Sequence, residues 1–149
     1  MAAAPASIAK DATIIDRADA SGKMTLLRQG TNGWTCMPNS PKSKYVLNNA
    51  MCMDANFAEF LAAMRARKQP ALKAMGVSYM LTGDQWVSNT TPSAKGPKPD
   101  NDWHHVFANI MIAYPHRSSL AGLPVKPTSK GAYVMWAETP YAHVMLPMK

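Results

Sequence analysis

With 149 residues, of which 47% are apolar and 17% charged, the chain is long enough for one domain with a hydrophobic core and too apolar for intrinsic disorder. No run approaches the roughly 18 consecutive apolar residues that predict a membrane span. The net charge of +7 comes from basic residues spread along the chain without interleaved aromatics, so nucleic-acid binding is not expected. A solvated basic surface is the simplest interpretation, and an acidic partner, an anionic polymer or lipid headgroups are the alternatives.

The first residues bear on the compartment. Residues 1–7 are rich in alanine and lack the basic and long apolar regions of a signal peptide, which is typical of a chain processed after export. An ordinary cytosolic N-terminus is the alternative. We therefore expect residues 1–149 to form a single mature exported domain, periplasmic or extracellular, in which residues 1–10 are flexible or a processed N-terminus.

Three short strands are predicted next, at residues 13–16, 24–28 and 34–37. Cys36 lies in the third, and Cys52 follows 16 positions later with no odd thiol left over, a pattern that predicts a disulfide in an oxidising compartment. Closing a loop of that length stabilises a fold by about 3 kcal/mol in the chain-entropy model. Two unrelated buried thiols are the alternative.

One helix is predicted over about residues 54–68, capped by Asp54 or Asn56 and stopped by Pro70. Its apolar residues recur at helical spacing, at Phe57, Phe60, Leu61 and Met64. Because the helix begins directly after Cys52, the disulfide would attach its N-terminus to the strand at 34–37. The expected fold is therefore α+β, an antiparallel sheet with one main amphipathic helix and one disulfide.

The second half of the chain predicts strands at residues 77–81 and 106–114, separated by a long loop over residues 83–103. A loop of that length is typical of a binding-site rim, although a disordered excursion is an equal alternative. A second irregular connection is expected over residues 120–131, where Pro124 and Pro127 interrupt the pattern.

The last two strands, at residues 132–137 and 142–148, flank Glu138-Thr139-Pro140-Tyr141 and predict a hairpin with a four-residue loop. Both arms are apolar on both faces, so a second layer must cover the sheet. A homodimer would supply that layer. The alternative is that residues 13–28 and 120–131 of the same chain fold over the hairpin.

Several segments together resemble a group of small exported bacterial proteins. The segments are GTNGWTCMP at residues 30–38, MCMDAN at 51–56, YML at 79–81, VMWA at 134–137 and TPYAH at 139–143. The resemblance spans most of the chain and implies export and a shared fold. The group has no assigned activity, so it implies no catalytic residues. Glu138 departs from the pattern, which commonly has glycine there.

Familiar catalytic motifs are absent from the sequence: there is no G-x-S-x-G elbow, H-E-x-x-H helix, P-loop or G-x-G-x-x-G turn. A nucleophilic pair of Cys36 or Cys52 with His143 would need the thiolate that a disulfide removes. We therefore expect a non-catalytic binding or structural module without a cofactor, and an enzyme of unrecognised type is the alternative.

Methionine is the unusual residue, with 12 copies against 3 phenylalanines. Met37, Met51 and Met53 adjoin the two cysteines, so the disulfide would gather three thioethers, whose soft sulfur favours Cu(I). A periplasmic copper-binding protein with Met and His ligands is therefore a third hypothesis. The simpler alternative is methionine as an adaptable core filler.

Aromatic residues and one histidine are the remaining candidates for ligand binding. They are Trp34, Trp86, Trp103, Tyr141 and His143, which could line a pocket for a small apolar or anionic ligand. Their alternative role is as core and loop anchors. If His143 is buried it needs a hydrogen-bond partner, which Glu138 or Asp102 could supply.

Overall fold

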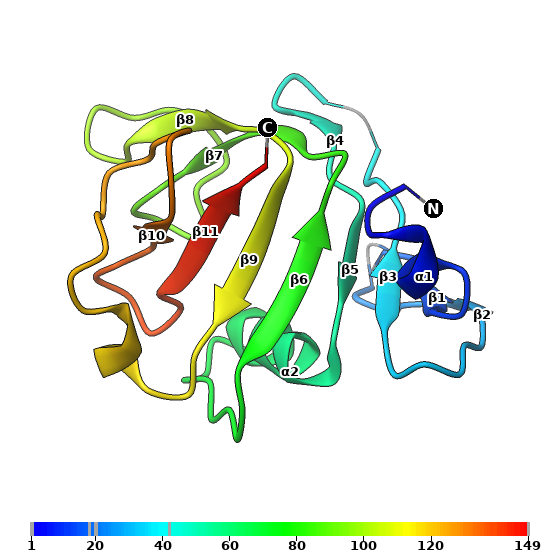
Figure 1. The fold of residues 1–149 in the computed structure, drawn as a ribbon. Helices are drawn as coiled ribbons and strands as arrows, with labels where there is room; N and C mark the ends of the chain where they lie inside the picture. The colour runs from blue at the N-terminus through cyan, green and yellow to red at the C-terminus, as the bar shows by residue number, and fades with distance from the viewer. Residues whose placement is uncertain (1, 18, 20, 42, 149) are drawn as a thin grey trace.

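A computed structural model describes residues 2–17, 19, 21–41 and 43–148, and Figure 1 shows two sheets and one main helix. The α+β class and the single disulfide predicted from the sequence are confirmed. Within the described part of the chain, no helix is long and apolar enough to cross a membrane.

The main sheet has eight strands in the order β10-β11-β9-β6-β5-β3-β1-β2. In chain order they are β1 (Thr13–Ile15), β2 (Leu26–Arg28), β3 (Thr35–Met37), β5 (Met51–Met53), β6 (Gly76–Met80), β9 (Asn109–Ala113), β10 (Tyr133–Met135) and β11 (His143–Pro147). All neighbours are antiparallel except β1 and β3, which pair in parallel. The expectation of an antiparallel sheet is corrected at this pair, because the chain reverses twice between β1 and β3, before and after β2.

A second sheet of three antiparallel strands, β4 (Val46–Asn48), β7 (Asp84–Ser88) and β8 (Trp103–Val106), has the order β4-β7-β8. The sequence did not predict β4 or β7, and it placed β8 and β9 partly in one strand at 106–114. The expected long loop at 83–103 is therefore wrong in extent. Residues 84–88 of this segment form β7, and residue 103 is the first of β8. The two strands pair, with Trp86 opposite His105 and Val87 opposite His104.

Helix α2 (Ala55–Arg65) is capped as expected, since the Asp54 carboxylate accepts a hydrogen bond from the backbone N–H of Phe57 at 2.8 Å. The same carboxylate accepts from the N–H of Val77 at 3.0 Å, which attaches the helix start to β6. The helix ends three residues earlier than predicted. Arg67 adopts a φ of 55°, and the Lys68 N–H donates to the Ala63 carbonyl at 2.9 Å, a Schellman-type end. Two shorter helices are α1 (Ala6–Ala9) and η1 (Arg117–Leu120).

The disulfide joins Cys36 and Cys52, which lie directly opposite each other on β3 and β5, and both are fully buried. Residues from the chain start cover this face of the sheet, where α1 lies against β3 in Figure 1. Ala3, Ala4 and Ala9 are each no more than 6% exposed. These three alanines of the segment 2–10, which was expected to be flexible or a processed N-terminus, are packed against the sheet, while most of its other residues are exposed.

The opposite face of the main sheet is a methionine layer. Because side chains alternate along a strand, the observed register puts seven of them on this one face. They are Met37, Met51, Met53, Met80, Met111, Met135 and Met145, each no more than 8% exposed. Helix α2 and the strands β7 and β8 cover this layer.

The predicted terminal hairpin is confirmed, with Val134 opposite Val144. Its loop is longer than the four residues predicted, because β10 ends at Met135. Trp136 has a φ of 56°, and its backbone N–H donates to the Asn89 carbonyl instead of to a neighbouring strand. Val134 and Val144 are only 3% and 5% exposed. The segment 120–131 lies beside β10, where the Val134 N–H donates to the Pro124 carbonyl at 2.8 Å, and its residues Leu123 and Val125 line a hollow together with Val134. The uncovered face that motivated the dimer is therefore closed by the chain itself, whereas β1 and β2 lie at the far edge of the sheet.

Candidate functional site

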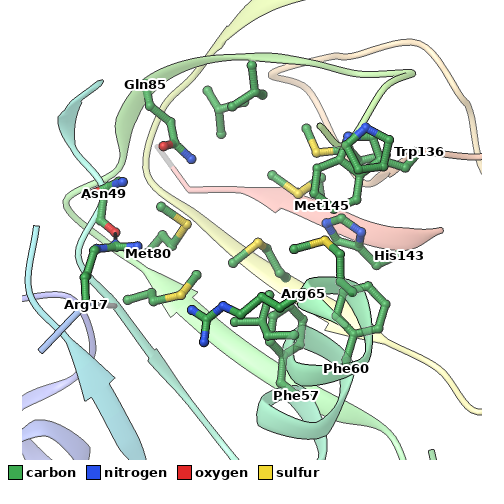
Figure 2. Close-up of a pocket in the computed structure, with 18 residues that line it drawn as sticks. Arg17, Asn49, Phe57, Phe60, Arg65, Met80, Gln85, Trp136, His143 and Met145 are labelled. Atoms are coloured by element: carbon green, nitrogen blue, oxygen red, sulfur yellow. Dashed lines mark hydrogen bonds between the residues drawn. The ribbon is translucent and has the colours of Figure 1, made fainter. Parts of the chain in front are cut away.

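A pocket of about 270 Å³ lies between the main sheet, α2 and the second sheet (Figure 2). Six methionines line it, Met51, Met64, Met80, Met111, Met135 and Met145, and we call it the methionine pocket. Five come from the methionine layer of the sheet, and Met64 comes from α2. Because thioether side chains are flexible and polarisable, such a wall adapts to the shape of what it contacts.

One end of the pocket carries two guanidinium groups, those of Arg17 and Arg65. The half-buried Arg17 side chain donates to the backbone carbonyls of Pro38 and Asn49. Arg65 directs its two terminal nitrogens at the sulfurs of Met24 and Met37, at 3.3 and 3.6 Å, and thioethers are weak acceptors. Among the side chains that the structure describes, neither arginine forms an ion pair.

The positive charge of Arg65 acts on Arg17. Burial and the neighbouring charge of Arg65 lower the pKa of Arg17, and Asp16 opposes that shift. Arginine nevertheless stays protonated at physiological pH. An apolar pocket with two such cations at its edge has an electrostatic preference for an anion.

The other end of the pocket contains His143 and Trp136. The His143 ring nitrogen Nδ1 lies 2.9 Å from the Tyr141 carbonyl oxygen, which can only accept, so Nδ1 carries the proton. The partner expected from the sequence, Glu138 or Asp102, is thus wrong. The His143 ring also meets the rings of Trp136, Phe60 and Phe57 edge-on, at centroid distances of 5.0, 5.5 and 6.4 Å.

Full burial lowers the pKa of His143 from 6.5 to about 4, although its hydrogen bond to Tyr141 opposes the shift. Between about pH 4 and 6.5 the imidazole of His143 is therefore protonated in the unfolded chain and neutral in the folded one. This contribution to the free energy of unfolding should be fully present above about pH 6.5, and the free energy of unfolding should fall by about 3 kcal/mol as the pH drops to 4. Urea unfolding between pH 7 and 4 measures this. In His143→Phe the free energy of unfolding should depend less on pH. An equal pH dependence in both proteins would contradict the lowered pKa of His143.

The sequence-predicted ligand residues are only partly brought together. His143 lines the methionine pocket, and Tyr141 lies beside its rim in a hollow shared with Met64 and Arg65. Trp34 packs on Tyr79 next to the disulfide. Trp86, 42% exposed, stacks on His105, and Trp103 meets Tyr45 edge-on. These three tryptophans therefore do not share a pocket with His143.

The methionines around the cysteines share one face, with Met37 directly opposite Met51. Of the three, only Met51 lines the methionine pocket, and the sulfur of Met37 accepts from Arg65. Within the described residues, no group of three or more His, Cys, Asp and Glu side chains is placed to hold a metal ion.

Sequence reasoning missed Arg17, Arg65 and Trp136 as pocket residues. Arg65 falls near the end of the helix predicted over residues 54–68 and Trp136 in the strand predicted over 132–137, and nothing in the sequence near Arg17 marks it as a pocket residue. Met80, Met111, Met135 and Met145 fall in predicted strands, where methionine as a core filler was the simpler interpretation. Their placement on alternate strand positions could have indicated a shared face, but only the strand order shows that the positions adjoin. Pro92, in the loop between β7 and β8, does contribute to the rim.

Comparison of the chain with protein-family models, with curated proteins and with solved structures finds no match.

Proposed function

We propose that this protein is an exported, non-catalytic binding domain that holds a small apolar molecule with an anionic group in the methionine pocket. The observation that carries the proposal is the pair of guanidinium groups at the edge of an apolar pocket, without a carboxylate partner among the described side chains. A carboxylate or similar anion would accept hydrogen bonds from the Arg65 guanidinium, which now faces only weak sulfur acceptors, and its charge would be stabilised by the nearby Arg17.

The shape of the pocket supports a ligand with two different ends. Arg17 bonds to the Asn49 carbonyl just before β5, and Arg65 is the last residue of α2. His143 and Trp136 lie by β10 and β11, and apolar side chains line the space between. From β11 to β5 is three strand spacings, or about 14 Å. The volume of about 270 Å³ is close to the lower end of small-molecule sites. A short acyl or aromatic carboxylate fits these dimensions.

A binding role is favoured over catalysis by the chemistry of the pocket wall. Its imidazole, His143, bonds to a backbone carbonyl rather than to a carboxylate, so it lacks the partner that orients a catalytic base. The two cysteines are joined in a disulfide on the opposite face of the sheet, which removes the cysteine–histidine pair considered from the sequence. Export is supported by that disulfide and by the resemblance described above.

Octanoate is a suitable probe for this proposal, and isothermal titration should show saturable one-to-one binding. Arg65→Met should weaken octanoate roughly 10- to 100-fold, the cost of a charge-assisted hydrogen bond, and Arg17→Met should act in the same direction. Octanol, which lacks the charge, should bind the wild type and the variants alike, showing that the pocket is intact.

Lys68→Met is the matched control, because it removes one exposed positive charge just beyond α2 and outside the methionine pocket. It should leave octanoate affinity unchanged. Octyltrimethylammonium binding as tightly as octanoate, or an equal loss in Lys68→Met and Arg65→Met, would show that the arginines do not select an anion and would contradict the proposal.

A further inference from the structure

Soft donor atoms gather at the end of the methionine pocket away from the arginines. Met135 on β10 lies directly opposite His143 on β11, and Met145 follows His143 by two residues on the same face. Directly opposed residues in an antiparallel pair have Cβ atoms about 5 Å apart. The three side chains are 4%, 2% and 2% exposed, so they share a dry, contiguous patch of the pocket wall.

His143 is oriented as a ligating histidine usually is. Its Nδ1–H donates to the Tyr141 carbonyl, which fixes both the ring orientation and the tautomer, and a metal-binding histidine commonly makes this bond with its other nitrogen. The lone pair is therefore on Nε2, for which the structure shows no hydrogen bond among the described residues. The ring is held from three sides by Trp136, Phe60 and Phe57.

The chemistry of these donors selects the ion. Thioether sulfur with neutral imidazole nitrogen is a soft set that suits Cu(I). Neutral ligands in a buried site also favour a monovalent over a divalent ion, because the cost of burying charge rises steeply with its size. The Trp136 ring, 5.0 Å from the His143 ring, adds an aromatic surface next to the patch.

We propose that Met135, His143 and Met145 form a Cu(I)-binding site at the inner end of the methionine pocket. This goes beyond anion binding, because it uses different side chains at the opposite end. It also differs from the copper hypothesis drawn from the sequence, which placed the ligands at Met37, Met51 and Met53. Arg17, which follows β1, and Arg65, the last residue of α2, carry their charges at the other end of the pocket, away from the proposed ligands.

The test is an anaerobic titration of the purified protein with Cu(I) against a chromophoric Cu(I) chelator. One Cu(I) should bind per chain. Met135→Leu and Met145→Leu keep the side-chain volume and remove the sulfur, so the fold should persist. Loss of a residue that only supports a metal ligand typically lowers metal affinity roughly 10- to 100-fold. Because Met135 and Met145 would be ligands themselves, each substitution should lower the Cu(I) affinity by at least that factor.

Met53→Leu is the matched control, since Met53 is buried in the same layer but does not line the pocket. It should leave Cu(I) affinity unchanged, and so should Arg65→Met, which separates this site from the anion end. X-ray absorption of the one-to-one complex should show both sulfur and nitrogen ligands, with the nitrogen lost in His143→Phe. Retention of all copper by the chelator, an equal effect of Met53→Leu and Met135→Leu, or a copper environment without sulfur would overturn the proposal.

Discussion

Replacing both cysteines, Cys36→Ala with Cys52→Ala, is expected to lower the free energy of unfolding by about 3 kcal/mol. Because the disulfide closes a 16-residue separation between adjacent strands, its loss frees the unfolded chain more than the folded one. For a chain of this size the melting temperature should drop by roughly 6–12 °C. Alanine is a better replacement than serine, because both sites are fully buried and a buried serine hydroxyl without a hydrogen-bond partner would destabilise the fold. Urea and thermal unfolding measure the two quantities.

The matched control is to reduce the disulfide of the wild type chemically. Dithiothreitol should destabilise the wild type by a similar amount and leave the alanine variant unchanged. Thiol titration of the unfolded, non-reduced wild type should find no free thiol. Two free thiols, or an alanine variant as stable as the wild type, would remove the disulfide from this account and with it the main support for export.

The second large effect is expected at Gly76, where β6 passes closest to α2. A Cβ at this position would lie 2.5 Å from the backbone nitrogen of Phe57 and 2.9 Å from its Cα. Because backbone atoms cannot rotate away as a side chain can, Gly76→Ala must push the start of α2 off the sheet. The expected cost is about 1–3 kcal/mol or more. Octanoate binding should also weaken, since Phe57 and Phe60 form part of the pocket wall.

Gly131→Ala is the matched control for this substitution. A Cβ there meets nothing within 4 Å, and the glycine does not have a positive φ. Its stability should therefore be unchanged or raised by about 0.4–1 kcal/mol, because alanine restricts the unfolded chain. If Gly76→Ala proved as harmless as Gly131→Ala, the close packing of α2 on β6 would be wrong.

Local patterns predicted the parts of the fold that local chemistry determines. The Asp54 cap, the helical spacing from Phe57 to Met64 and the pairing of two cysteines each depend on residues near one another in sequence. Strand β7 was missed because its residues alternate too weakly to stand out from a loop. The end of α2 was placed too late, since Arg67 adopts a left-handed φ that its residue type does not suggest.

The methionine pocket depends on strand order, which no local pattern contains. Met51, Met80, Met111 and Met145 belong to four strands that become neighbours only because β9 inserts between β6 and β11. Arg17 and Arg65 reach the same end of the pocket from distant parts of the chain, the segment after β1 and the last residue of α2. The sequence therefore showed an abundance of methionine and made His143 a candidate ligand-binding residue, but it could not show that they line one wall.

Methyl NMR of the methionine side chains tests the central claim most directly, because the twelve methionines report on different parts of the molecule. Octanoate added to protein labelled at the methionine methyl carbons should shift the signals of Met51, Met80, Met111, Met135 and Met145 and saturate at one equivalent. Met75 and Met148, which are 46% and 42% exposed and lie outside the pocket, should not move. Shifts confined to these exposed methionines, or none that saturate, would contradict a binding function for the methionine pocket.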